Sequence, residues 1–287
     1  MKNGVVLLIG RPNVGKSTLL NNLIGQKVAI TSPKPQTTRF PIRAFYQEER
    51  GQVIFVDTPG IFNKAKDTLS KKINLRAAKA YEEDIDLVLY IVDPTRKRDF
   101  EEAKILGIVR KIEKPKILVI NKTDQELKYL PLYKFLEEEF KEIIQVSALN
   151  KKNLKVLLEK IFQYLPEKKE PLIDIKNFPF PAMNIDSKTF IAEIIREKVF
   201  LQTRNEVPYR TMVLVDEIIE RNNKLTYIKA RILTTDDRYK KMLIGENGRK
   251  IKVIGSMTRK ELELATNKKI YLELTVETDP HWPEVYY

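Results

Sequence analysis

Residues 10–18, GRPNVGKST, have the types and spacing of a phosphate-binding loop, and they directly follow the apolar run VVLLI. The stretch fits the pattern G-x-x-x-x-G-K-[ST] between a strand and a helix. Its glycines permit a tight loop whose backbone N–H groups turn inward around phosphates. Lys16 would reach the terminal phosphates, and the Ser17 hydroxyl would bind Mg²⁺. The alternative is a glycine-bearing turn that fits by chance. The predicted phosphate contacts are Gly10, Arg11, Pro12, Asn13, Val14, Gly15, Lys16, Ser17 and Thr18.

A second motif, DTPG at residues 57–60, ends the next strongly apolar run. Asp57 can reach the Mg²⁺ shell, and the Gly60 amide can meet a terminal phosphate. A magnesium-linked carboxylate beside a phosphate-sensing loop is what a nucleotide switch requires. Thr58 and Pro59 complete the motif and are predicted to line the same site.

The motif NKTD, residues 121–124, follows a third apolar run and favours guanine over adenine. Asp124 can accept two hydrogen bonds from the ring N–H and the exocyclic amine of guanine, which adenine cannot supply. The stem of Lys122 can cover the base plane, and Asn121 can tie this segment to the phosphate loop. An ATP-using enzyme is therefore the less favoured interpretation.

A fourth motif, SAL at residues 147–149, ends the next apolar run. It would place the Ala148 amide near the guanine keto oxygen, with Ser147 and Leu149 beside it. Each motif is weak alone. Four in this order, each at the C-terminal end of a strand, where α/β sheets bind ligands, predict a guanine-nucleotide site rather than a chance match.

With these motifs the sequence resembles the translation-factor-like P-loop GTPases. The resemblance makes TTR at residues 37–39 the switch-one signature and Thr38 the second hydroxyl on Mg²⁺, with Thr37 as the rival candidate. The predicted metal ligands are Ser17, Thr38 and Asp57. Many GTPases place a glutamine after the DxxG glycine to orient the attacking water, but Ile61 stands there in this chain, so we expect slow intrinsic hydrolysis.

Related GTPases with this substitution hold K⁺ through an asparagine of the phosphate loop, and the matching residue is Asn13. Potassium would supply the positive charge that an arginine finger supplies elsewhere. The other interpretation is that Asn13 only tolerates a left-handed loop geometry. The residues predicted to take part in hydrolysis are Asn13, Lys16, Thr38 and Gly60.

Composition excludes several classes of site. The chain has no cysteine and one histidine, His281, so disulfides, thiolate zinc sites and histidine-based triads are excluded. No apolar run reaches the length of a membrane span, and MKNGVV does not resemble an export signal, so we expect a cytoplasmic protein. The net charge of +13 favours an anionic partner, either nucleic acid or an acidic membrane surface.

The chemistry-bearing motifs must be positioned by alternating strands and helices. Almost wholly apolar strand runs alternate with helical segments at Lys16–Ile24, Leu69–Tyr81, Phe100–Lys111 and Leu154–Tyr164, which predicts a doubly wound, mostly parallel α/β domain over residues 1–165. Four prolines predict a linker over residues 166–182. Residues 183–287 have the order α–β–β–α–α–β of a compact α+β domain.

The second domain contains LIGENGRKIKVIG, residues 243–255. Its G-x-x-G turn separates two helical segments, and glycines there let the backbone approach single-stranded RNA, as in KH domains. From Arg238 to Lys260 there are eight basic residues and one acidic residue. A solvated helix face is the other interpretation, but the apolar spacing behind the turn favours RNA. The predicted RNA contacts are Lys241, Ile244, Gly245, Glu246, Asn247, Gly248, Arg249, Lys250 and Lys252.

A GTPase domain followed by a type II KH domain resembles the Era GTPases, and the stretches KPQTTR, EIIREKVF and VPY match as well. The resemblance implies GTP hydrolysis, binding near the 3′ end of 16S ribosomal RNA, and a role in assembly of the 30S subunit. We expect the protein to be a monomer. One departure is that family members usually carry a further helix after the last strand, whereas this chain ends with DPHWPEVYY. The alternative function is a protein-interaction switch attached peripherally to the inner membrane.

Overall fold

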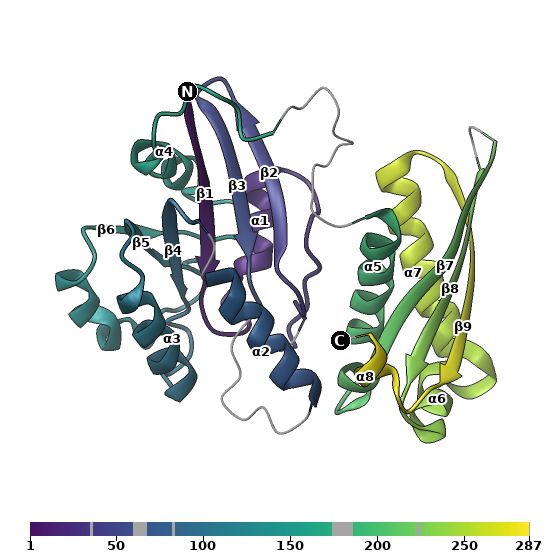
Figure 1. The fold of residues 1–287 in the computed structure, drawn as a ribbon. Coiled ribbons are helices and arrows are strands. Elements are labelled where there is room, and N and C mark those ends of the chain that lie inside the picture. The colour runs from purple at the N-terminus through teal and green to yellow at the C-terminus, as the bar shows by residue number, and fades with distance from the viewer. Residues whose placement is uncertain (35–36, 60–67, 82–83, 174–185, 223–224, 287) are drawn as a thin grey trace. The chain divides into compact units, whose positions relative to one another are not determined.

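The computed structural model describes residues 1–34, 37–59, 68–81, 84–173, 186–222 and 225–286. The chain divides into two compact units, Met1–Asn184 and Ile185–Tyr287 (Figure 1). Each unit has its own sheet and its own hydrophobic core. Among the described residues, no helix has both the length and the apolar character needed to cross a membrane.

The first unit is built on a six-stranded sheet with the order β2-β3-β1-β4-β5-β6. All neighbouring pairs are parallel except β2 and β3. Parallel pairing brings the C-terminal ends of β1, β3, β4 and β5 to one edge. The strands are β1 (Lys2–Ile9), β2 (Ile42–Glu48), β3 (Gly51–Asp57), β4 (Leu87–Val92), β5 (Lys116–Ile120) and β6 (Glu142–Gln145).

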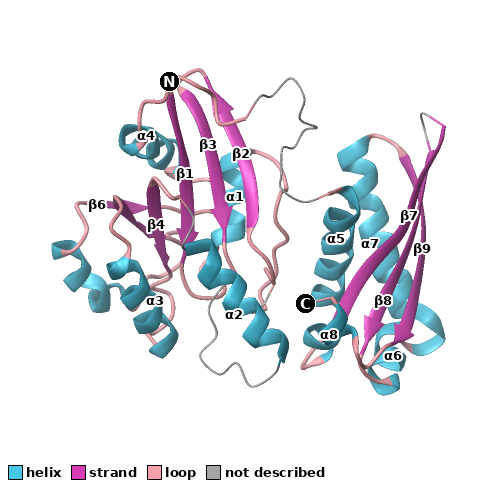
Figure 2. Cartoon of the chain, viewed as in Figure 1, coloured by secondary structure: helices cyan, strands magenta, loops and turns pink. Residues whose placement is uncertain are grey.

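Helices cover both faces of this sheet, as Figure 2 shows. Because successive strand side chains point to opposite faces, Leu8 packs with α1 and α4, whereas Leu7 packs with α3 and the 3-10 helix η1. This arrangement confirms the predicted doubly wound α/β domain. The helical elements are α1 (Lys16–Ile24), α2 (Thr68–Tyr81), α3 (Phe100–Lys111), η1 (Leu130–Glu138) and α4 (Leu154–Tyr164).

Strand β2 was not predicted from the sequence. The segment IRAFYQE mixes apolar and polar residues, and β2 is the edge strand of the six-stranded sheet that the described residues form. It pairs antiparallel with β3, from Ile42 opposite Asp57 to Glu48 opposite Gly51. The pairing fixes where the chain leaves the switch-one segment, because β2 begins four residues after Thr38.

The second unit has the predicted KH order. Strands β7 (Thr211–Asn222) and β8 (Leu225–Thr234) are antiparallel, and β9 (Lys269–Thr278) pairs parallel with β8. Helix residues such as Ile195, Leu243 and Ile254 share one core with the sheet. The remaining elements are α5 (Ser187–Gln202), η3 (Val207–Arg210), α6 (Asp237–Ile244), η4 (Glu246–Gly248), α7 (Arg249–Thr266) and the short α8 (Trp282–Val285).

The first part of the predicted linker, residues 166–173, is hydrogen-bonded to the sheet of the first unit. The Asn3 amide donates to the carbonyl oxygen of Pro166 at 3.1 Å, and the Leu172 amide donates to Gln52 Oε1 at 2.6 Å. Residues 174–182 lie outside the described residues, so the boundaries of the linker stay a prediction.

Candidate guanine-nucleotide site and RNA-binding turn

The phosphate loop joins β1 to α1, as its pattern predicted. Gly15 has φ +100°, a left-handed conformation that favours glycine, and a side chain there would collide with Asn121. A side chain at Gly10 would collide with the carbonyl oxygen of Ile91. Both glycines are therefore required by the close approach of neighbouring segments.

Lys16 is folded back over its own loop. Its Nζ donates to the carbonyl oxygens of Gly10 at 2.9 Å and Arg11 at 3.2 Å, and its side chain is buried. Burial lowers the pKa of Lys16, and the Asp57 carboxylate partly opposes that shift. An anion entering the loop would replace carbonyl oxygens as the partner of this ammonium group.

Three oxygen-bearing side chains converge at the start of α1. Ser17 Oγ donates to Asp57 Oδ2 at 2.6 Å, and Thr38 Oγ1 lies 3.2 Å from Ser17 Oγ. The other carboxylate oxygen, Asp57 Oδ1, is buried and has no hydrogen-bond partner among the described residues. Burial raises the pKa of Asp57, opposed by Lys16 and Ser17. A buried, unpartnered carboxylate oxygen beside two hydroxyls fits a hard cation such as Mg²⁺.

The two rival threonines of switch one have different surroundings. Thr38 faces Ser17, whereas Thr37 Oγ1 donates to the carbonyl oxygen of Lys34 at 2.7 Å. The structure thus places the hydroxyl of Thr38, the threonine that the resemblance favoured, beside Ser17, and the hydroxyl of Thr37 beside the Lys34 carbonyl.

Asn121 connects three motifs. Its Nδ2 donates to the carbonyl oxygen of Val14 at 2.7 Å, and its Oδ1 accepts from the Ala148 amide at 2.9 Å. This buried side chain joins the phosphate loop, the NKTD segment and the SAL segment. The sequence predicted the link to the phosphate loop but not the link to the SAL segment.

The rest of NKTD is held by two further side-chain contacts. Lys122 adopts φ +65°, and its Nζ lies 2.7 Å from Asp93 Oδ2. Asp124 Oδ1 accepts from Ser147 Oγ at 2.5 Å. The SAL segment is also held by Asn22, whose Nδ2 donates to the carbonyl oxygen of Ala148 at 2.6 Å.

Asn13 lines a cavity at the phosphate loop, whereas Thr58, Pro59 and Leu149 are not among the lining residues of that cavity. Asn13 has φ +64°, and its Nδ2 donates to the carbonyl oxygen of Pro33 at 2.8 Å. Thr58 Oγ1 donates to the carbonyl oxygen of Leu8 at 3.0 Å, and the Leu149 side chain is exposed. Pro59 follows directly, whereas Gly60 and Ile61 lie outside the described residues. The lining residues of the cavity are Pro12, Asn13, Gly15, Lys16, Ser17, Thr18, Ile30, Thr31, Ser32, Thr37 and Thr38.

Arg11 was predicted to contact the nucleotide, and its side chain binds elsewhere. Its side chain is buried and binds the segment after β4, donating to the carbonyl oxygens of Asp93 at 3.1 Å and Lys97 at 3.0 Å. Only the main chain of Arg11 remains at the phosphate loop. The pattern G-x-x-x-x-G-K-[ST] gives the position of this residue but not the direction of its side chain.

The G-x-x-G turn of the second unit joins α6 to α7. Gly245 and Gly248 both have φ +73°, and Asn247 has φ +50°. A Cβ at Gly245 would lie 2.8 Å from Lys250 Cβ, whereas a Cβ at Gly248 would meet nothing within 4 Å. The turn therefore needs left-handed residues, and its open side at Gly248 can receive another backbone closely.

Charged side chains surround this turn. Lys241, Glu246, Arg249 and Lys252 are exposed, and Lys250 and Ile244 are partly exposed. None of these four basic side chains forms an ion pair with a residue in the part of the chain that the structure describes. The positive charge near the turn is thus available to an anionic partner.

Family comparisons agree with both units. Residues 5–122 match the family described as 50S ribosome-binding GTPase, and residues 206–282 match the KH domain. The GTPase Era of Halothermothrix orenii is 41% identical, over 99% of this chain and 95% of that protein. The GTPase Era of Clostridioides difficile is 39% identical, over 98% of this chain and 94% of that protein.

Two solved structures are similar across both units. One is Era in complex with MgGDPNP and nucleotides 1506–1542 of 16S ribosomal RNA, with a TM-score of 0.90, 37% identity, and coverage of 99% of this chain and 95% of that one. The other is a tyrosine-to-alanine variant of Aquifex aeolicus Era bound to GDP.AlF4-, with a TM-score of 0.89, 37% identity, and coverage of 99% and 96%. From its two-unit fold, its four nucleotide motifs and these full-length relatives, the chain belongs to the Era family of GTPases.

Proposed function

We propose that this protein binds and hydrolyses GTP, and that it binds 16S ribosomal RNA near its 3′ end during assembly of the 30S subunit, as a cytoplasmic monomer. The observation that carries the nucleotide half is Asn121, which joins three motifs through its hydrogen bonds to Val14 and Ala148. The described complex of a relative with MgGDPNP and 16S RNA supports the RNA half.

Guanine selection follows from the segments that Asn121 holds. Asp124 accepts the two N–H groups of the guanine edge, the Lys122 stem covers the base, and the Ala148 region faces the keto oxygen. The β- and γ-phosphates lie against the loop of residues 10–18, where Lys16 exchanges its carbonyl partners for phosphate oxygens.

Ser17, Thr38 and Asp57 would hold Mg²⁺. The orphaned Asp57 Oδ1 and the adjacent hydroxyls supply the oxygen ligands that this ion prefers. When bound, the ion would neutralise charge on the phosphate oxygens. The chain's own contribution is to hold those ligands at the N-terminal end of α1.

We also propose that K⁺ binds at Asn13 and assists GTP hydrolysis. Because Asn13 Nδ2 donates to the Pro33 carbonyl, its Oδ1 is the atom that would bind a cation. A cation there would supply positive charge near the phosphates, in a chain that has Ile61 where many GTPases place the water-orienting glutamine.

The second unit would bind RNA through the turn of residues 245–248. The left-handed glycines let the RNA backbone approach, and the basic side chains around them supply electrostatic attraction. We further propose that GTP and GDP give different RNA affinities, since a switch requires a ligand to bind two states unequally.

Fluorescence anisotropy with a labelled RNA of the 16S 3′ end tests the RNA half. Full-length protein should bind it, and Lys250→Gln and Lys252→Gln should each weaken binding and lower the salt slope by about one. Lys229→Gln is the control, because Lys229 alternates with the buried Ile228 and Ala230 and so faces away from the helices.

Three binding measurements separate this proposal from its alternatives. Equal RNA affinity with GDP and GDPNP would remove the proposed switch. Binding to anionic lipid vesicles with no binding to RNA would favour the peripheral-membrane alternative. ATP that displaces bound GTP at equal concentration would overturn the guanine assignment.

A further inference from the structure

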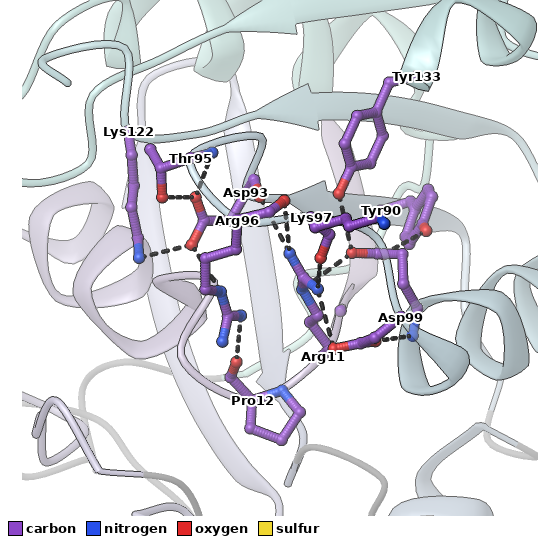
Figure 3. A network of polar contacts seen from close by, with 12 residues as sticks. Arg11, Pro12, Tyr90, Asp93, Thr95, Arg96, Lys97, Asp99, Lys122 and Tyr133 are labelled. Carbon is purple, nitrogen blue, oxygen red and sulfur yellow. Dashed lines mark hydrogen bonds and ion pairs between the residues drawn. The ribbon is translucent and has the colours of Figure 1, made fainter. Parts of the chain in front are cut away.

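The segment after β4, residues 93–99, lies between the phosphate loop and the base-binding NKTD segment. The Asp93 side chain is fully buried, and its Oδ1 accepts from the amide and hydroxyl of Thr95 at 3.0 and 2.6 Å. Its Oδ2 lies 2.7 Å from Lys122 Nζ, as Figure 3 shows. Asp93 therefore holds the end of the side chain whose stem covers the base in the proposed function.

The same carboxylate is linked to the phosphate loop. Arg96 Nε lies 3.2 Å from Asp93 Oδ2, and Arg96 donates through NH2 to the carbonyl oxygen of Pro12 at 2.8 Å (Figure 3). One buried carboxylate thus contacts two cations, Lys122 of the base-binding segment and Arg96, which binds the phosphate loop. Both contacts are ion pairs, and burial of the Asp93 carboxylate strengthens its attraction to the two cations.

Arg11 fastens the phosphate loop to the same segment from the other side. In addition to its carbonyl partners, its guanidinium pairs with Asp99 at 3.1 Å and with Glu102 at 3.0 Å. The Glu102 carboxylate accepts from the hydroxyls of Tyr90 at 2.5 Å and Tyr133 at 3.3 Å. These contacts anchor residues 93–99 to β4, α3 and η1.

We infer that Asp93 is a positioning residue for guanine nucleotides. It holds Lys122 over the base and, through Arg96, holds the phosphate loop at a fixed distance from Lys122. This inference rests on the proposed function. It concerns both GDP and GTP, because the base and the phosphate loop are common to both. Asp93 itself touches neither ligand.

Dissociation of N-methylanthraniloyl-GDP from the full-length protein tests the inference. Asp93→Asn keeps the shape of the side chain but removes its charge, so dissociation should accelerate about tenfold. Asp84→Asn makes the same charge change at an exposed residue that pairs with Lys114 at 3.7 Å, and it should leave the rate unchanged.

A double-mutant cycle with Lys122→Met provides a readout that a general loss of stability would not move. If Asp93 acts through Lys122, the double variant should dissociate no faster than about twice the rate of Lys122→Met alone. The inference would be overturned if the rate increase of the double variant equalled the product of the increases of the two single variants. A wild-type dissociation rate for Asp93→Asn would overturn it as well.

Arg96→Gln keeps the test informative if Asp93→Asn fails to fold. Arg96 is partly exposed, and its loss should release the Pro12 carbonyl and accelerate dissociation about threefold while the melting temperature of the nucleotide-free protein stays unchanged. An unchanged rate would contradict the inference. A wild-type protein that binds no guanine nucleotide would instead refute the proposed function.

Discussion

Asn22 on α1 donates through Nδ2 to the carbonyl oxygen of Ala148, at 2.6 Å, and so holds the segment whose amide faces guanine in the proposed function. Asn121 holds the amide side of the same residue at 2.9 Å. Ala148 is therefore fixed on both sides, by a helix that begins at the phosphate loop and by the NKTD segment. A change at Asn22 should alter base binding without touching the phosphates.

We predict that Asn22→Ala weakens GDP and GTP binding about fivefold. One hydrogen bond contributes about 0.5–1.5 kcal/mol, and its loss leaves the Ala148 carbonyl without this donor. Isothermal titration calorimetry measures the effect. Gln26→Ala, at an exposed residue just after the same helix, is the control and should bind like wild type. Equal affinities for Asn22→Ala and the control would show that Ala148 needs no support from α1.

The two switch-one threonines should differ in hydrolysis. Thr38→Ala removes the hydroxyl that lies 3.2 Å from Ser17 Oγ, so the Mg²⁺ concentration for half-maximal GTP hydrolysis should rise about tenfold. Thr37→Ala removes a hydroxyl that donates to the Lys34 carbonyl and should change this Mg²⁺ concentration less than about twofold. Phosphate release at varied Mg²⁺ measures both variants, and the reverse order would assign the metal to Thr37.

The positions of the nucleotide motifs were predictable because each follows a strand, and a parallel sheet gathers the C-terminal ends of its strands at one edge. Spacing alone could not choose between Thr37 and Thr38, which are adjacent in one loop, so the choice of Thr38 rested on the family resemblance. Strand β2 was not predictable, because its edge position leaves its sequence without a continuous apolar pattern.

The direction of side chains explains the other contacts that the sequence did not predict. Arg11 lies inside a phosphate-loop motif, yet its guanidinium binds carbonyl oxygens after β4. Asp93 and Arg96 follow a strand end just as the predicted site residues do, so their place in the chain was a usable signal. The contact between Asp93 and Arg96 is local, but their partners across the site were not readable, because Lys122 and Pro12 lie far from them in sequence.

Potassium should accelerate GTP hydrolysis several-fold relative to sodium. The reason is that Asn13 Nδ2 donates to the Pro33 carbonyl, so that Asn13 Oδ1 is the side-chain atom that can bind a cation. Asn13→Ala should abolish the difference between the salts, and Asn13→Gly should do the same while tolerating the positive φ of 64°. Single-turnover hydrolysis in matched K⁺ and Na⁺ buffers measures it. Equal wild-type rates in both salts would leave Asn13 with a purely conformational role.

The ion pair between Lys122 and Asp93 should give a nucleotide affinity that is insensitive to pH near neutrality. Burial opposes ionisation of Asp93, but hydrogen bonds from Lys122 and Thr95 outweigh it and hold the pKa of that carboxyl below its ordinary value. With the folded pKa below the unfolded value of about 3.9, the contribution of the carboxylate is complete above that value and is lost only as the pH falls through the folded pKa.

The ratio of GDP dissociation rates between Asp93→Asn and wild type should consequently stay constant from about pH 6 to about pH 8. Stopped-flow measurements at three pH values in that range test this, with Asp84→Asn as the reference for a charge change elsewhere. A ratio that changed more than about twofold across the range would mean that a group other than Asp93 controls the position of Lys122, because a carboxyl with a lowered pKa remains ionised throughout.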